Sequence, residues 1–471
     1  MNGAVLFILT NILAFLALGV ALCTPDSLMG LSWALTLASL ISLLATLRAF
    51  WGSWITLSQF FVLFFALYTL SGPYEVLFGS GQIAPFSPPF LITNWLIDAS
   101  VAIIAFSLGM LLIRFLAPLK RDTRVSRLVE PGPYRFAIMF MAAATSSELT
   151  NLARVGFSAL LGGKAIYQGK VSELTLALPS SIFALLAFGL LGLSFANYSV
   201  RKVLVSILPA IIIAFPLLVV HLILGQRLEL AMYLIAFTLG WFYRRPLARF
   251  PARTVGVGLA LYLIFSPIYA FRWTFPLILS GETISLSEND ARKLLLSSLN
   301  PALNEFGASF GNYSTFLQAV DFALLWGESY LKDLTVVIPR FLYPGEKPKS
   351  IVYEFRDTFF SDWANNSTIA GTAFSSLLEA RWNFGNLGPL LVFFSYGLLL
   401  GMLERMRLRT HSLWFASFYT SFSMFVLIVH RSSTGGTLSA YFWVILLIAG
   451  MYILSELIKP LWKRKGKPIV R

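Results

Sequence analysis

Long apolar runs without charge alternate with short polar segments along most of the chain. The runs are continuous, and each covers roughly 16 to 22 residues, close to the length that crosses hydrocarbon as an α-helix. Lipid admits only helices or closed barrels, and barrel strands need alternating polarity. The pattern therefore predicts an all-α polytopic membrane protein with about twelve transmembrane helices, near residues 4–22, 32–47, 54–71, 96–117, 135–150, 179–197, 203–221, 228–243, 254–271, 387–403, 412–429 and 437–457.

One long polar segment divides these spans into two groups. Residues 1–271 would hold transmembrane helices one to nine, residues 272–386 a large periplasmic loop with short helices, and residues 387–471 the last three helices and a basic cytoplasmic tail. The loop is rich in aromatic residues, so it can bury apolar surface, and disorder is not expected. Within it we expect one helix over 287–299 and one amphipathic helix over 316–333.

Composition and charge agree with this architecture. The 471 residues are 57% hydrophobic and 12% charged with a formal net charge of +14, whereas soluble proteins have about 25% charged residues. Placing both termini in the cytoplasm puts most of the span-flanking Lys and Arg there, including Arg114 and Arg405. The positive charge thus indicates topology and contact with anionic lipid. It does not indicate nucleic-acid binding, because no single basic patch with interleaved aromatics is present.

The amino-terminal segment and the single cysteine restrict the chemistry further. No basic residue precedes the first apolar run, and the Cys-Thr-Pro-Asp that ends it is a poor cleavage site. We therefore expect a retained membrane helix there and not a removed signal peptide. Cys23 alone excludes an internal disulfide and a cysteine-based metal cluster. The sequence also has no Walker loop and no HExxH pattern.

Cations at the predicted outer edge of the membrane are the first candidates for function. Arg227 follows span seven, and His430 and Arg431 end span eleven, on the side where positive charge is depleted. A charge beside hydrocarbon is costly unless it is paired or lines a wet cavity. We predict that all three are catalytic, with His430 as a base. The acids Glu379, Asp321 and Glu328 are the alternatives for the base, unless they are solvated charges. The alternatives are a snorkelling arginine and a cationic cap at a helix carboxyl end.

Further polar side chains in the outer segments are candidates for substrate binding. Arginine and lysine hold phosphate oxygens, and aromatic rings suit the faces of sugars. The alternative is a solvated loop with ordinary surface ion pairs. The predicted substrate-binding residues are Arg154, Lys164, Arg340, Lys347, Arg356, Glu379 and Arg381.

Four short stretches resemble the bacterial oligosaccharide repeat-unit polymerases, the Wzy-type O-antigen polymerases. They are GQRLELAMYLIAFTLGWF, IPRFLYPGEKPKS, SSLLEARWNFGNLGPLLVFFSYGLLLG and VHRSSTGG, in this order along the chain. The resemblance implies an outer-edge arginine, a proline- and glycine-rich turn in the main periplasmic loop, and an arginine before the last span. By position these motif cations are Arg227, Lys347 and Arg431.

The resemblance also implies an activity. Such a polymerase joins repeat units carried on undecaprenyl diphosphate at the periplasmic face of the inner membrane, for O-antigen, exopolysaccharide or capsule synthesis. Donor and acceptor are both lipid-linked oligosaccharides, and a chain-length-regulating co-polymerase is an expected partner. No metal and no other cofactor is expected, because the lipid diphosphate is the leaving group. Fixed guanidinium groups would stabilise its developing charge.

Three other functions remain open. A glycan ligase that moves finished polymer to a lipid A core would share this architecture and leaving group. A transporter or flippase predicts repeated halves, broken helices and polar residues at mid-span. A structural or assembly protein would not require charged residues at the membrane edge, such as Arg227 and Arg431.

Overall fold

Helices account for all the regular secondary structure in the part of the chain that the structure describes. A computed structural model gives the arrangement. It describes residues 3–23, 28–79, 89–116, 132–161, 167, 170–171, 180–195, 200–224, 226–243, 247, 292, 305–319, 323–336, 338, 343, 348–360, 373–410 and 412–465. The predicted all-α class is confirmed for these residues. The predicted helix over 287–299 lies outside them, apart from Arg292.

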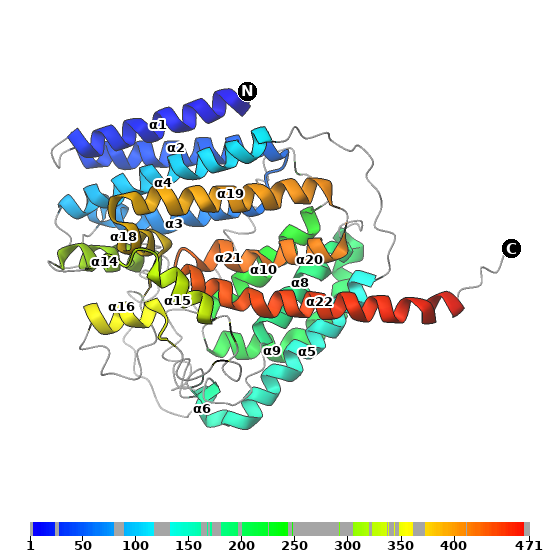
Figure 1. Ribbon diagram of the computed structural model, residues 1–471. Helices are drawn as coiled ribbons and strands as arrows, with labels where there is room; N and C mark the ends of the chain where they lie inside the picture. Colours follow the sequence, from blue (N-terminus) through cyan, green and yellow to red (C-terminus); the bar gives the residue numbers. More distant parts are fainter. Residues whose placement is uncertain are drawn as a thin grey trace.

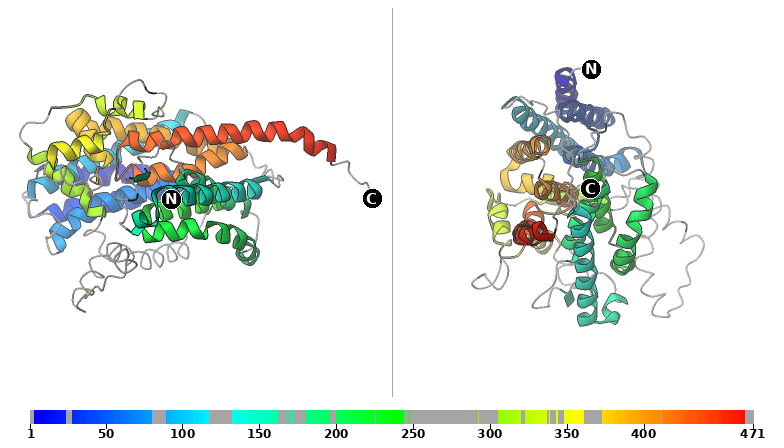
Figure 2. Two further views of the ribbon diagram at one scale, coloured as in Figure 1. Left: turned by 90° about the horizontal axis from the view of Figure 1, so that it is seen from below. Right: turned by 90° about the vertical axis from the view of Figure 1, so that its right-hand side faces the viewer.

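The helices form one elongated bundle with most axes roughly parallel (Figures 1 and 2). The long helices are α1 (Gly3–Cys23), α2 (Met29–Trp51), α3 (Leu57–Phe78), α4 (Pro89–Leu116), α5 (Gly132–Val155), α8 (Ser180–Phe195), α9 (Val200–Ile223), α10 (Arg227–Phe242), α19 (Gly388–Arg409) and α22 (Thr434–Lys465). Shorter ones are α6 (Phe157–Leu161), α14 (Glu305–Gln318), α15 (Glu328–Val336), α16 (Ile351–Phe359), α18 (Ser376–Phe384), the 3-10 turn η4 (Gly385–Leu387), α20 (Leu413–Ser421) and α21 (Ser423–Ile428).

Seven of the described helices are long and apolar enough to cross a membrane, so the chain is an α-helical membrane protein. These segments are Gly3–Cys23, Met29–Trp51, Leu57–Phe78, Leu91–Leu116, Ser206–Ile223, Ser376–Arg409 and Thr434–Ile453. Three shorter apolar helices cover Ser180–Phe195, Leu228–Phe242 and Leu413–Ile428. The expected span over 254–271 lies outside the described residues, so the total of twelve stays a prediction, as do the domain boundaries.

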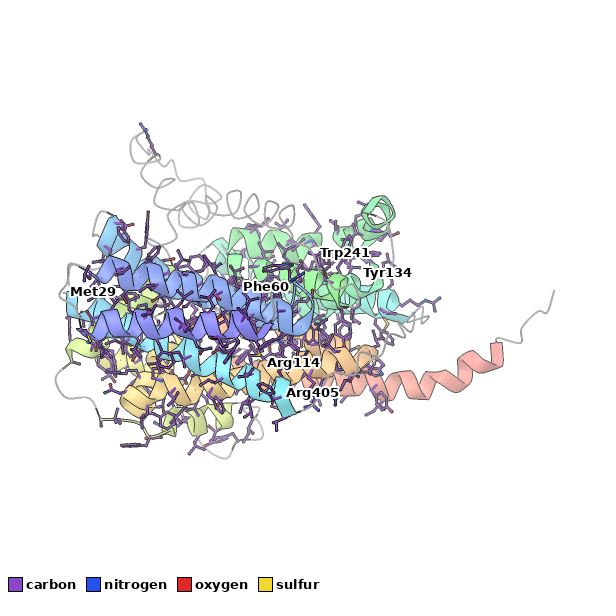
Figure 3. The ribbon with its side chains drawn as sticks, turned by 90° about the horizontal axis from the view of Figure 1, so that it is seen from above. Met29, Phe60, Arg114, Tyr134, Trp241 and Arg405 are labelled. Carbon is purple, nitrogen blue, oxygen red and sulfur yellow. The ribbon has the colours of Figure 1, made fainter. Side chains whose placement is uncertain are left out.

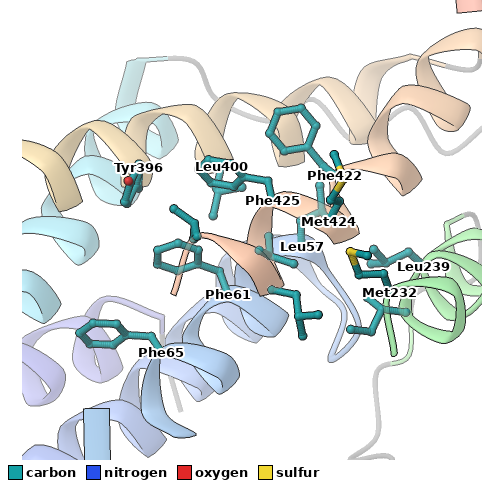
Figure 4. Packing of buried hydrophobic residues seen from close by; sticks show 14 of the residues in the cluster. Leu57, Phe61, Phe65, Met232, Leu239, Tyr396, Leu400, Phe422, Met424 and Phe425 are labelled. Atoms are coloured by element: carbon teal, nitrogen blue, oxygen red, sulfur yellow. The ribbon is translucent and has the colours of Figure 1, made fainter. Parts of the chain in front are cut away.

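Small residues let neighbouring helices approach closely. A Cβ on Gly397 of α19 would overlap the Phe106 carbonyl of α4, and one on Gly192 of α8 would overlap the Phe237 carbonyl of α10. Helix association in lipid depends on such backbone contact, because lipid tails remove the hydrophobic drive between helices. Larger side chains fill the centre, where Phe61, Leu400 and Phe425 pack between α3, α19 and α21 (Figure 4).

The short helices of the predicted outer loop gather at one end of the bundle (Figure 1). Aromatic rings hold them together, because Trp382 of α18 packs on Phe316 of α14 and on Phe355 and Phe359 of α16. The predicted continuous helix over 316–333 is wrong. Helix α14 ends at Gln318 and α15 begins only at Glu328. Between them the chain turns at Trp326 and Gly327, which both have positive φ.

The two ends of the bundle differ in their residues. We call the end with α14, α15, α16 and α18 the loop end, and the opposite end, where Arg114 and Arg405 lie, the arginine end (Figures 1 and 3). Figure 1 places the amino end of α1 and the carboxyl end of α22 toward the arginine end. This grouping agrees with the predicted topology, although the side of the membrane to which each end belongs stays a prediction.

Candidate functional site

The start of α22 lies at the loop end and carries a cluster of buried polar groups. Two of its backbone amides donate hydrogen bonds to carboxylates from other helices. Thr434 donates from N–H and Oγ1 to Oε2 of Glu379, at 2.8 and 2.7 Å, and Gly435 N–H donates to Oδ2 of Asp333 at 3.0 Å. Free amides at a helix amino end favour negative charge, so each carboxylate stabilises this end.

Glu379 and Asp333 reach α22 from α18 and α15, and we call them the carboxylate pair. Both side chains are buried. No Lys or Arg within the described ranges forms a salt bridge with either of them. The second oxygen of Asp333, Oδ1, is buried without a hydrogen-bond partner among those residues. Two carboxylates so close together disfavour double ionisation.

Asp333 lies outside the membrane-spanning helices, and its environment shifts its titration. Burial raises the pKa of Asp333 to about 6, although hydrogen bonds from Ser433 and Gly435 favour the ionised form and lower it. Glu354 on α16 adds a repulsive charge that raises the pKa further. Asp333 therefore exchanges a proton near neutral pH, as a general base or acid requires.

Asn383 holds α15 and α18 in register under this pair. Its Nδ2 donates to Ser329 Oγ and to the Glu379 carbonyl, both at 2.8 Å, and its Oδ1 accepts from Gly327 N–H at 3.1 Å. Ser329 Oγ in turn donates to Oε1 of Glu379 at 3.3 Å. From α19, the hydroxyl of Tyr396 lies 2.6 Å from Thr434 Oγ1. The carboxylate pair is thus fixed by side chains from several helices.

His430 lies just before this cluster, and it is buried among aromatic rings. Its ring is 4.5 Å from that of Phe61 and 5.7 Å from that of Phe65, and Nε2 is 3.1 Å from the Phe61 carbonyl oxygen. Nε2 must donate in that bond, since a carbonyl only accepts. Burial lowers the pKa of His430 to about 3. Such a group is a weak base, so the position favours a role in fixing the α21–α22 junction to α3.

Arg381 forms a second buried network beside the pair. Its Nη1 lies 3.0 Å from Oδ1 of Asp98 on α4, and the Tyr313 hydroxyl of α14 donates to the other oxygen of that carboxylate. Asp98 is almost fully buried, whereas the Arg381 side chain is 16% exposed. The guanidinium group thus joins the loop helices to α4 and keeps some contact with the surroundings.

The structure brings together four of the residues predicted from sequence. Glu379 and Arg381 lie on α18, whereas His430 and the partly exposed Arg431 lie between α21 and α22, just before the start of α22 that Glu379 contacts. Arg356 of α16 forms an ion pair with its neighbour Asp357 at 2.7 Å. Its guanidinium also lies over the ring of Tyr353, so its charge is already partnered.

The other predicted cations are placed less fully. Lys164, Arg340 and Lys347 lie outside the described residues. Arg227 begins α10, and its side chain is not among those described. Arg154 is exposed near the end of α5, beside a separate small apolar cluster that includes Leu160 and Leu224. The predicted roles of these five residues stay predictions.

A sequence match within α14 has no catalytic geometry. Residues 307–311 read G-x-S-x-G, the pattern of a hydrolase nucleophile elbow. The elbow requires a strand-to-helix turn that exposes the serine, but Ser309 lies in the interior of a helix and is buried. Among the described residues, moreover, no group of three or more His, Cys, Asp or Glu side chains is arranged to hold a metal ion.

Sequence reasoning missed Asp98 and Asp333. A signal existed for Asp98, because it is a lone acid within the apolar stretch LITNWLIDASVAIIAF, and an ionisable group inside a span marks a candidate site. Asp333 gave no comparable signal, since its partner Gly435 is 102 positions away.

Comparisons with protein-family models, with curated proteins and with solved structures found no match to this chain.

Proposed function

We propose that this chain is a membrane glycosyltransferase that polymerises undecaprenyl-diphosphate-linked oligosaccharide repeat units at the periplasmic face of a bacterial inner membrane. The observation that carries the proposal is the contact between two of its four motif stretches. Glu379 of SSLLEARWNFGNLGP binds Thr434 of VHRSSTGG at 2.7 and 2.8 Å, although 55 positions separate them. Motifs that converge on one buried polar cluster at the end of a helical bundle suit a shared site.

The groups of this cluster fit the steps of such a transfer. The acceptor hydroxyl attacks the anomeric carbon of the donor, the bond from that carbon to the diphosphate oxygen breaks, and the hydroxyl proton passes to a carboxylate. Asp333 has a pKa suited to receiving that proton. The partly exposed Arg381 and Arg431 would stabilise the negative charge that develops on the departing lipid diphosphate.

The assignment of the base differs from that predicted from sequence. We assign proton transfer to the carboxylate pair and a positioning role to His430, because His430 is buried with a lowered pKa. Because α15 packs against the start of α22, substrate must gain access to the carboxylate pair between these two helices. A lipid-linked donor would approach from the bilayer, so a site at the end of membrane helices suits it.

The test is the pattern of surface glycans in a strain that lacks this chain and carries it again on a plasmid. The wild-type gene should restore a ladder of long chains. Glu379→Gln and Arg431→Ala should leave single repeat units on their acceptor, at equal amounts of protein in the membrane. Arg405→Ala, at the arginine end, is the matched control and should restore the ladder.

Two results would contradict the proposal. Normal ladders from both site variants would remove the carboxylate pair and Arg431 from catalysis. Loss of every glycan from the acceptor in the deletion strain, with free polymer accumulating on its lipid carrier, would identify a ligase in place of a polymerase.

A further inference from the structure

One tryptophan at the loop end is exposed on a strained turn. Trp326 has 75% of its surface exposed. Its φ of 48° makes it the only non-glycine residue with positive φ among those that the structure describes. Bulky side chains rarely adopt this conformation, and it persists only where the surroundings impose it.

Three hydrogen bonds impose this turn. Leu325 N–H donates to the Trp382 carbonyl at 3.1 Å, Trp326 N–H to the Asn383 carbonyl at 2.9 Å, and Gly327 N–H to Asn383 Oδ1 at 3.1 Å. The backbone is therefore fixed to the carboxyl end of α18, while the indole ring extends away from the core. An indole combines a large apolar face with a single N–H donor, which suits a surface that is apolar on one side and wet on the other.

The turn lies at the rim of a membrane helix. Gly327 packs against the ring of Phe384, and Leu324 packs against Gly385. Phe384 and Gly385 lie at the junction of α18 and η4, just before α19 begins. Large exposed apolar side chains continue from η4 into α19, with Leu387 of η4 62% and Leu390 and Leu391 of α19 40% and 48% exposed. They belong to the candidate membrane segment Ser376–Arg409. On the other side of the indole, the side chain of Glu328 is 56% exposed.

We propose that the Trp326 turn, together with Leu387, is a contact with the lipid surface, in which the indole lies at the headgroup level of the bilayer and attaches α15 to the membrane. Tryptophan concentrates at this level in membrane proteins. The apolar surface that continues into α19 and the charge on Glu328 match the two sides of such an interface. A sugar ring is the less suited partner, because the surface that continues from the indole is apolar.

This contact would fix the depth of the candidate site. Asp333 lies on α15, seven residues after Trp326, so an anchored turn holds the carboxylate pair just beneath the headgroups. The inference does not depend on the proposed reaction, because it concerns only where the turn lies in the bilayer.

The single cysteine of the chain makes the depth measurable. In a Cys23→Ser background, we would introduce Trp326→Cys, Leu387→Cys and Leu390→Cys one at a time, attach a nitroxide, and reconstitute each protein in phosphatidylethanolamine–phosphatidylglycerol vesicles. Leu387→Cys leaves the strained turn intact, so it tests the contact even if Trp326→Cys perturbs the fold. Tyr353→Cys is the matched aqueous control, since Tyr353 is 47% exposed on α16 beside charged side chains.

The readout is the accessibility of each nitroxide to oxygen, which enters the bilayer, relative to a water-soluble nickel chelate. We expect this ratio to be several-fold higher at 326 than at 353, and to rise from 326 through 387 to 390. Equal ratios at 326, 387 and 353 would overturn the proposal. Nickel access at 326 that a soluble oligosaccharide blocks would also overturn it, and would assign the indole to a glycan.

Discussion

Two buried carboxylate sites, Glu404 at the arginine end and the carboxylate pair at the loop end, compensate their charge in different ways. At the arginine end, Glu404 on α19 forms a buried ion pair with Arg407 at 2.9 Å. The other oxygen of that carboxylate accepts hydrogen bonds from the Tyr419 hydroxyl at 2.7 Å and from Ser58 N–H at 3.3 Å. The carboxylate of Glu404 and the guanidinium of Arg407 are thus in direct contact, because the two residues lie on successive turns of α19.

At the carboxylate pair, amides and hydroxyls replace the cation. Glu379 and Asp333 accept hydrogen bonds from Thr434, Gly435 and Ser329, and neither forms a salt bridge with a Lys or Arg in the described ranges. One carboxylate oxygen of Asp333 has no partner there. Hydrogen bonds give the carboxylate oxygens partners but do not neutralise the buried negative charge, so a bound proton has to neutralise part of it.

This difference separates structural from chemical roles. The ion pair of Glu404 with Arg407, together with the hydrogen bonds from Tyr419 and Ser58, ties α19, α20 and α3 to one another. Asp333, which lacks a cation and whose pKa burial raises to about 6, gains and loses a proton near neutral pH, which suits proton transfer. We therefore expect variants of Arg407 to affect stability and variants of the carboxylate pair to affect activity.

The largest expected effect comes from Gly435→Ala. The added Cβ would overlap Cβ and Cγ of Asp333, and because that Cβ is bonded directly to the α15 backbone, α15 has to move away from α22. We expect complete loss of long glycan chains and faster proteolysis of the loop. Gly450→Ala is the matched control on the same helix, because nothing lies within 4 Å of the site of its Cβ. A wild-type ladder from Gly435→Ala would show that α15 need not dock there.

The next test compares one variant from each site, Arg407→Leu and Glu379→Gln, in both stability and activity. Arg407→Leu leaves Glu404 buried without its cation, which should cost about 3–5 kcal/mol of unfolding free energy. Glu379→Gln keeps one oxygen that accepts from Thr434, reverses the hydrogen bond with Ser329 and removes one of two repelling charges, so its stability should change by no more than about 1 kcal/mol. Denaturant unfolding in detergent measures both. The comparison fails if Glu379→Gln is the less stable variant and retains full activity.

Apolar runs made the membrane helices predictable, because about twenty uncharged residues have few other structures available in lipid. The break at Trp326–Gly327 was not predictable, since helical periodicity continues through FLQAVDFALLWGESYLKD and only hydrogen bonds to Trp382 and Asn383 impose the turn. The candidate site was partly predictable. Glu379 and Arg431 stand out as charges at a membrane edge, whereas the role of Asp333 depends on a glycine that is distant in sequence.

The docking of α15 should weaken as pH rises. The pKa of Asp333 is about 6 in the folded protein and would fall to its ordinary value of 3.8 when the residue is exposed. A carboxyl group whose pKa is raised on folding stabilises the fold most below the lower value and loses that contribution as pH rises through the higher one. The loss should be about 2 kcal/mol between pH 4 and 7.

Hydrogen exchange of the α15 amides across this pH range measures the effect, after correction for the intrinsic pH dependence of exchange. Asp333→Asn cannot ionise and should give protection that is independent of pH. Glu379, Glu354 and Tyr330 also face Asp333, and they remain unchanged in this variant. A pH dependence that persists in Asp333→Asn would assign the titration to Glu354 or Glu379.

The smallest expected effect separates strain from the anchoring role of the loop-end turn. Glycine adopts positive φ without steric cost, so Trp326→Gly should raise the unfolding free energy in detergent by about 1 kcal/mol. Trp326→Phe keeps the strain and should leave it unchanged. In vesicles, the amides of α15 should be better protected from hydrogen exchange in Trp326→Phe than in Trp326→Gly, because phenylalanine still reaches the lipid surface and glycine does not. Equal protection of α15 in both variants would mean that the bilayer does not hold the turn, and that contacts within the loop end are sufficient to place Asp333 on α22.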